Sequence, residues 1–161
     1  MPSSPGMIVF VNSWQTYQHH LVEAISHLTD EQLDLRVAPN QRSVRELVAH
    51  IIATRANWFY HALSQGGETM AAFGAWQGPD APARSAGELV EGLTATWDVV
   101  GAAVGMWKAE EMVETVSGEW RGRPFSFTRA WIVWHVLEHD LHHGGELSLT
   151  LGAHGLSGLA I

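Results

Sequence analysis

Two histidines near the C-terminus have the spacing of a metal site. His139 and His143 are four residues apart in a segment without proline. Each residue turns an α-helix by about 100°, so both side chains would lie on one helical face, one turn apart. This H-x-x-x-H spacing lets two imidazoles reach one ion at about 2.0–2.1 Å. Because catalytic zinc sites use three protein ligands and a water, the pair predicts a site that needs a further ligand.

His50 is the best candidate for the third ligand. It lies beside Ala49, Ile51 and Ile52, on the apolar face of an expected helix, which is an unusual place for an imidazole without a partner. The ordinary explanation of such a residue is a hydrogen-bonded core histidine, and that alternative stays open. Other histidines could share this face at a different height (His61), lie less clearly inward (His19, His20, His27) or follow the last helix (His154).

Three more polar residues lie close to the His139–His143 stripe. His135 lies one turn before His139, and Glu146 lies three residues after His143, which places it on the same face. His142 points about 60° to the side. Glu146 could be a fourth ligand, a hydrogen-bond partner of a ligand, a general base or a bystander in water. Glu146 and His142 are therefore the candidate proton-transfer residues.

Several other catalytic motifs are excluded. The segment from His135 to His139 matches H-x-x-E-H, but only 22 residues follow it, too few for the downstream ligand of the inverzincin proteases. Di-iron bundles need a pair of Glu-x-x-His motifs, and no such motif occurs. The sequence also lacks a G-x-S-x-G elbow, a P-loop and a G-x-G-x-x-G loop.

We expect the tryptophans to pack in the apolar core. They include Trp58, Trp97, Trp107, Trp131 and Trp134.

Prolines and N-terminal capping patterns divide the chain into blocks. Proline breaks helix interiors, and Ser or Thr followed three residues later by Glu or Gln opens a helix. Such patterns begin at Thr29, Ser43 and Ser85. We expect long helices over about 7–28, 43–66, 85–107 and 127–152, a short turn after Thr29, a long loop over 67–84 and a turn or small hairpin over 113–124.

The last helix carries one local conflict. Gly144 and Gly145 disfavour a helix interior, and residues 146–151 alternate like a strand. A lone strand after four helices would have no partner, so we expect the helix to continue. The glycines then indicate close approach of another backbone or of a bound molecule. With no convincing strand pairs, the sequence predicts an all-α four-helix bundle and a single domain spanning 1–161.

Composition narrows the chemistry and the partners. The chain has 161 residues, ten histidines, no cysteine and a formal charge of −8. A nucleic-acid partner is not expected without a basic footprint, nor is a membrane partner without a long apolar stretch. The first residues, MPSSPGMIVFVNSW, do not resemble a signal peptide, so we expect a cytoplasmic protein. Any metal site must use His, Asp or Glu.

Two segments together resemble the DinB/YfiT-like superfamily. They are the stretch from Arg45 to Ile52, which contains His50, and the stretch Trp134-His-Val-Leu-Glu-His-Asp-Leu-His-His-Gly-Gly-Glu-Leu. The resemblance extends over about residues 8–153. It implies a four-helix bundle that binds a divalent metal through His50, His139 and His143. The usual ending H-H-R-G-Q differs here, since Gly144 replaces an arginine and Glu146 replaces a glutamine.

The resemblance implies a metal-dependent enzyme acting on a small molecule, either a hydrolase or a thiol-dependent transferase. Zinc or nickel is the expected ion, and iron also suits three imidazoles. Because the chain has no cysteine, a thiol would be an exogenous low-molecular-weight cosubstrate. Two alternatives are a non-catalytic, stress-associated bundle with a structural metal and a plain dimeric bundle without metal. A homodimer is implied, and the substrate is expected to enter near the 65–84 and 113–124 loops.

Overall fold

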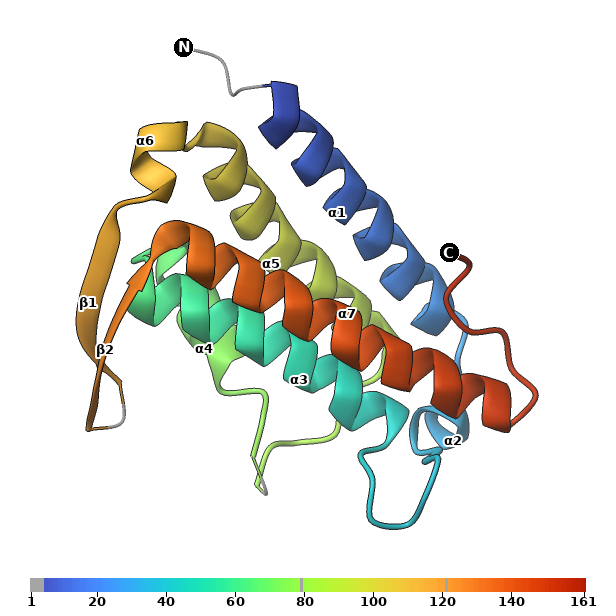
Figure 1. Ribbon diagram of the computed structural model, residues 1–161. Helices are drawn as coiled ribbons and strands as arrows, with labels where there is room; N and C mark the ends of the chain where they lie inside the picture. The colour runs from blue at the N-terminus through green and yellow to red at the C-terminus, as the bar shows by residue number, and fades with distance from the viewer. Residues whose placement is uncertain (1–4, 79, 121) are drawn as a thin grey trace.

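Four long helices form most of the protein and run alongside one another (Figure 1). The computed structural model describes residues 5–78, 80–120 and 122–161. The long helices are α1 (Pro5–Ile25), α3 (Val44–Asn57), α5 (Ala86–Met106) and α7 (Arg129–Ala153). Shorter elements are α2 (Asp30–Leu33), η1 (Trp58–Ala62), α4 (Gly67–Gly74), α6 (Ala109–Met112), β1 (Thr115–Trp120) and β2 (Arg123–Thr128). The fold is therefore mostly helical, with a small sheet.

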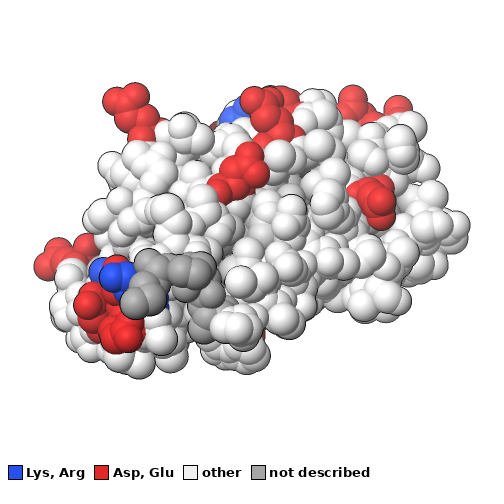
Figure 2. All heavy atoms as spheres, turned by 90° about the horizontal axis from the view of Figure 1, so that it is seen from above, with Lys and Arg blue, Asp and Glu red and all other residues white. Residues whose placement is uncertain are grey.

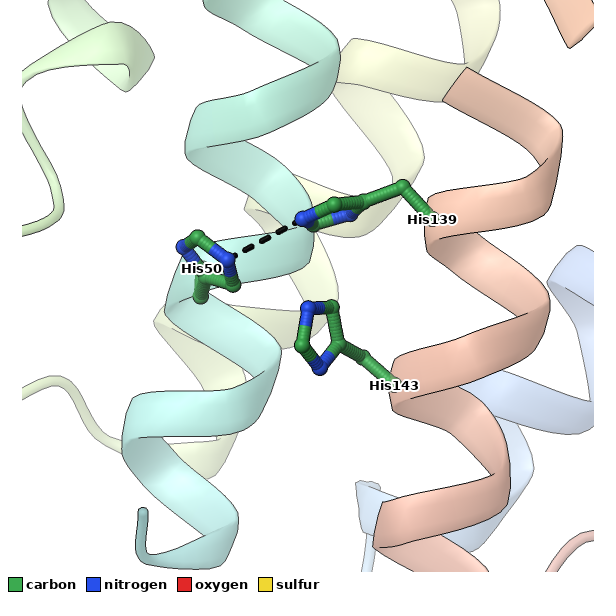
Figure 3. A group of neighbouring side chains, drawn as sticks. All are labelled: His50, His139 and His143. Carbon is green, nitrogen blue, oxygen red and sulfur yellow. Dashed lines mark hydrogen bonds between the residues drawn. The ribbon is translucent and has the colours of Figure 1, made fainter. Parts of the chain in front are cut away.

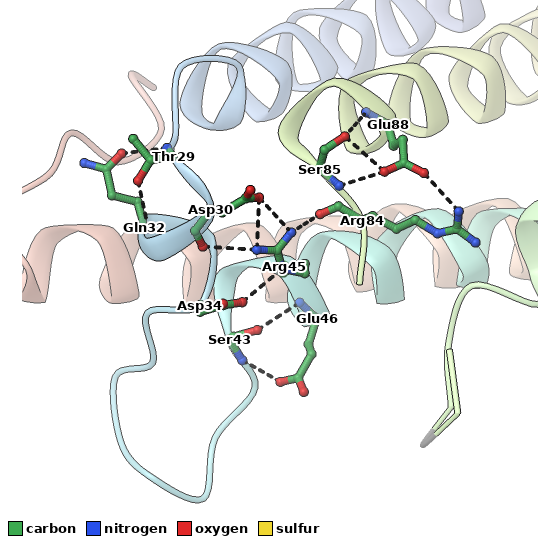
Figure 4. Close-up of polar contacts among 10 residues, drawn as sticks. All are labelled: Thr29, Asp30, Gln32, Asp34, Ser43, Arg45, Glu46, Arg84, Ser85 and Glu88. Atoms are coloured by element: carbon green, nitrogen blue, oxygen red, sulfur yellow. Dashed lines mark hydrogen bonds and ion pairs between the residues drawn. The ribbon is translucent and has the colours of Figure 1, made fainter. Parts of the chain in front are cut away.

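The three capping patterns read from the sequence begin helices as expected. In each, the side chain of the N-cap residue accepts a backbone N–H bond, and the Glu or Gln three residues later accepts the backbone N–H of the N-cap residue (Figure 4). These bonds satisfy amides that a helix start leaves free. The pairs are Thr29 with Gln32, Ser43 with Glu46 and Ser85 with Glu88.

Arg45 joins the starts of three helices (Figure 4). Its guanidinium donates to Asp30 and Asp34, which lie at α2, and to the backbone oxygen of Arg84 just before α5. Arg45 itself lies in the first turn of α3. These contacts hold α2 and the starts of α3 and α5 together at the end of α3 that lies near His50.

The segment after α3 differs from the expectation. The helix beginning at Val44 changes to a π-helix at Trp58–Ala62, and the predicted loop over 67–84 contains a further helix, Gly67–Gly74. Gly66 has a φ of +76°, a backbone conformation that glycine adopts without steric cost. Gly66 and Gly67, where the helix expected over 43–66 was to end, therefore also turn the chain into α4.

The all-α expectation is wrong in one element. Strands β1 and β2 form an antiparallel two-stranded sheet with Thr115 opposite Thr128 and Trp120 opposite Arg123. The hairpin that the sequence left as an alternative to a turn thus exists, and it runs past Pro124. As a result α7 begins at Arg129, capped by Thr128, rather than at Phe127.

The apolar core has two clusters, one at each end of the long helices. The first contains Leu21, Ile51, Leu93 and Leu147. The second is built around Phe59, at the end of the long helices that lies near the β1–β2 hairpin. Of the tryptophans expected in the core, Trp97 is buried, while Trp58 and Trp107 are partly buried against the second cluster. The expectation is wrong for Trp131 and Trp134, which are 40% and 55% exposed.

A buried ion pair lies at the centre of the helices. Arg55 and Asp140 are fully buried, and their charged atoms are 2.8 Å apart. Arg55 also donates to Gln18, and the indole N–H of Trp14 donates to Asp140 at 2.8 Å. Helices α1, α3 and α7 are thereby joined by one polar network directly beside His139.

No described helix is both long and apolar enough to cross a membrane. The expectation that no signal peptide is present concerns in part residues 1–4, which lie outside the described residues.

Candidate metal centre

The three histidines predicted as ligands lie together between α3 and α7 (Figure 3). His50 comes from α3, and His139 and His143 come from successive turns of α7. One nitrogen of each ring lies within 4.8 Å of the others, and the Nε2 atoms of His50 and His139 are 3.0 Å apart. Their ring centroids lie 4.3–4.8 Å from one another.

In two of the three rings, the nitrogen that points away from the group contacts a side-chain oxygen. The Nδ1 atom of His50 is 2.6 Å from Oε1 of Gln77, and the Nδ1 atom of His143 is 2.6 Å from Oε2 of Glu146. An oxygen acceptor on one ring nitrogen fixes the tautomer that offers the other nitrogen to a metal. The Nδ1 atom of His139 is buried without a hydrogen-bond partner, while its Nε2 lies 3.2 Å from Oγ1 of Thr54.

Burial keeps the group neutral. It lowers the pKa of His139 to about 2, and the neighbouring histidines add to this effect. Burial also lowers the pKa of His50 and of His143, although hydrogen bonds to Gln77 and Glu146 oppose it. Metals bind the neutral imidazole, so the rings are in the protonation state that ligands require.

The donor set fits a divalent ion. Two nitrogens that each lie about 2.0–2.1 Å from one tetrahedral zinc ion are roughly 3.3 Å apart, and the 3.0 Å between His50 and His139 is close to this value. Three imidazoles suit zinc, nickel, copper or iron. The residues present could thus hold such an ion with small adjustments of the rings.

Glu146 and His142 form a second, overlapping group with His143. Glu146 contacts the outer nitrogen of His143, and its other oxygen is 3.4 Å from Nε2 of His142. Burial raises the pKa of Glu146, but the hydrogen bond and charge of His143 lower it, and the net pKa is below its ordinary value. Glu146 is therefore the hydrogen-bond partner of His143, while the side chain of His142 is 66% exposed.

The remaining candidate histidines lie outside the group. His135 packs against Trp58 and Trp131, with ring centroids 5.0 Å from each. His61 is exposed and stacks on Trp120. The possibility that His61 shares the His50 face is thus not realised. The Nε2 of His154, after α7, is 2.9 Å from the backbone oxygen of Arg36.

Packing explains why position 144 is a glycine. It is buried in α7, and a Cβ added there would overlap the hydroxyl of Tyr17 from α1. That hydroxyl donates to the backbone oxygen of Asp140 at 3.3 Å. The close approach that the glycines indicated is therefore made by a tyrosine side chain, and it leaves no room for an arginine at this position. Gly145 is exposed and has open space around it.

A cavity of about 960 Å³ opens beside His50. Its wall includes Trp76, Gln77 and the loop before α3, in which Arg42 lies. The 65–84 loop expected at the entrance contributes, whereas no described residue of the hairpin lines the cavity. Gln77 and Arg42 were missed from the sequence, because nothing in their local pattern marks a place beside His50. Thr54 lies one helical turn after His50, and that spacing could have identified it.

Comparison with known proteins gives a consistent picture. The family model described as the DinB superfamily matches residues 13–147. A DinB-like protein from Bacillus cereus ATCC 10987 has a similar structure, with a TM-score of 0.68 and 19% identity over 94% of this chain and 95% of that chain. A DinB-family protein from Exiguobacterium sibiricum 255-15 gives 0.67 and 16% over 95% and 94%. Among curated proteins none matches.

Proposed function

The chain belongs to the DinB superfamily, and from this membership and the histidine geometry we propose that it is a metal-dependent enzyme acting on a small molecule. His50, His139 and His143 would hold one divalent ion, with zinc or nickel the best candidates and iron a further one. The observation that carries the proposal is the convergence of three neutral imidazoles beside an open cavity. In this proposal the four long helices form the four-helix bundle that the sequence predicts.

The metal would supply Lewis-acid chemistry and would lower the pKa of a water or thiol in its remaining coordination position. The protein residues have separate tasks. Gln77 and Glu146 orient the rings of His50 and His143 through their outer nitrogens. Glu146, whose carboxylate is held ionised by His143, accepts a proton during the reaction, and the exposed His142 beside it passes that proton to water.

Two reaction types fit this arrangement. In a hydrolase the nucleophile is water, and in a transferase it is a low-molecular-weight thiol. Because the chain has no cysteine, such a thiol must come from solution.

The experiment compares metal-free protein with nickel- and zinc-loaded protein in two assays. One follows hydrolysis of p-nitrophenyl acetate, and the other follows consumption of 2-mercaptoethanol with an aryl halide. We expect a metal-dependent rate in one assay, which also identifies the reaction type. Equal rates with and without metal in both assays, despite tight metal binding, would favour the alternative of a non-catalytic metal-binding bundle.

That alternative has one observation in its favour. Glu146 forms a second group with His142 and His143, which could hold a structural ion with a carboxylate ligand. We also propose a cytoplasmic homodimer, for which sedimentation analysis would give twice the chain mass. The absence of a nucleic-acid or membrane partner stays a prediction from composition.

A further inference from the structure

The cavity beside His50 has a polar wall rich in arginine. It lies between the loop that precedes α3 and the segment that follows α4, and Ala49 and His50 form part of it. Four arginines line it: Arg36, Arg42, Arg45 and Arg84. For a chain with a formal charge of −8, this is an unusual concentration of cations. The face in Figure 2 shows the ordinary surface, on which acidic side chains are far more common than basic ones.

Three of these arginines are already paired with carboxylates of the same region. Their charges are therefore largely neutralised within the protein, and their side chains serve to hold the loops. The pairs are Arg36 with Glu46 at 2.7 Å, Arg45 with Asp34 at 2.9 Å and Arg84 with Glu88 at 3.0 Å.

Arg42 differs from the other three. Within the described parts of the chain it makes no hydrogen bond, ion pair or ring contact, although it lines the same cavity. Among the described residues, Arg42 is thus an unpaired cation in the wall of the cavity that opens beside His50.

Aromatic side chains pack at the other end of the histidine stripe of α7. One turn before His139, the ring of His135 lies against Trp58 and Trp131. The cavity that has Arg42 in its wall also borders His50, so a small molecule that enters it can reach both residues. A planar guanidinium binds carboxylate and phosphate groups through paired, charge-assisted hydrogen bonds.

We propose that Arg42 binds an anionic group of the substrate, so that the protein acts on a small molecule with a carboxylate or phosphate at the end remote from the reacting atoms. This inference rests on the proposed function, because it takes the histidine group as the reacting end. Arg42 selects the substrate and sets its direction in the cavity. Carboxylate and phosphate share the chemistry that recognises them, and separate probes distinguish them.

The test is calorimetric titration of the full-length protein with succinate and, separately, with inorganic phosphate at low ionic strength. It is run on metal-free and on nickel-loaded protein, because both anions also bind metals. Arg42→Gln removes the charge, and Arg42→Lys keeps it. Arg123→Gln is the matched control, since Arg123 is exposed in β2, far along the chain from the cavity wall.

We expect wild type and Arg123→Gln to bind at least one of the two anions equally well. Arg42→Gln should bind it about tenfold more weakly, the loss expected when a charge-assisted bond is removed, and Arg42→Lys should recover part of that loss. The proposal is overturned if wild type binds neither anion, if Arg42→Gln binds like wild type, or if Arg123→Gln loses as much. The metal-free titration keeps this result separate from metal binding, so failure of the proposed function would not hide it.

Discussion

The Nε2 atoms of His50 and His139 lie 3.0 Å apart, although 89 positions separate the two residues in the chain. This contact is possible because α3 and α7 pack side by side (Figure 3). His143, one turn further along α7, completes the group. Three neutral imidazoles at such close range are the core of the functional interpretation.

The contact between Gly144 and Tyr17 predicts opposite effects for two neighbouring substitutions. Gly144→Ala should lower the free energy of unfolding by about 1–3 kcal/mol, because its Cβ overlaps the Tyr17 hydroxyl. Gly145→Ala, in open space on the same helix, should raise it by about 1 kcal/mol through helix propensity. Urea unfolding measures both, and equal effects of the two substitutions would contradict the packing explanation.

Tyr17 should lose its proton at a higher pH than an ordinary tyrosine does. Burial raises its pKa to about 12, with the charge of Asp140 adding to the effect. A raised pKa in the folded state means that its contribution to stability is complete below about pH 10 and is lost as pH rises toward about 12. Tyr60→Phe leaves Tyr17 as the single tyrosine, so the ultraviolet absorbance of its phenolate reports it alone. A midpoint near pH 10 in the folded variant would be inconsistent with this burial.

The ion pair of Arg55 and Asp140 predicts a large loss of stability on neutralising one partner. Asp140→Asn would leave the guanidinium buried without a counter-charge, which costs about 3–5 kcal/mol. The exposed ion pair of Arg36 and Glu46 is the control, and Glu46→Gln should cost about 1 kcal/mol or less. Denaturant unfolding of the two variants checks this, and similar losses would argue against a special role for burial.

Glu146 should tune the metal site without being required for it. Glu146→Gln keeps a hydrogen-bond acceptor for Nδ1 of His143, so the protein should still bind one ion, about tenfold to a hundredfold more weakly. His142→Ala should have little effect, because His142 is exposed and outside the three-histidine group. Competition with a coloured chelator gives the affinities. Complete loss of metal in Glu146→Gln would instead support Glu146 as a fourth ligand of a closed site.

The sequence reveals those parts of the protein that depend on local chemistry. The capping residues Ser43 and Ser85 and the helical spacing of His139 and His143 are local, and the structure has them as expected. The pairing of β1 with β2 depends on contacts between segments of weak strand pattern, which explains why the hairpin was only one of two alternatives. Gln77 contacts His50, and Arg42 shares a cavity wall with it, only through the fold of the loops, so no spacing rule identifies them.

The account is tested most directly by the metal content of the protein after loading with nickel or zinc and removal of free ions. Wild type should retain about one ion per chain, and so should His61→Ala, which removes a histidine outside the group. His50→Ala, His139→Ala and His143→Ala should each lose it, while circular dichroism shows that they remain folded. A wild type that retains no metal, or single variants of the three histidines that still hold one ion with wild-type affinity, would contradict the three-histidine site.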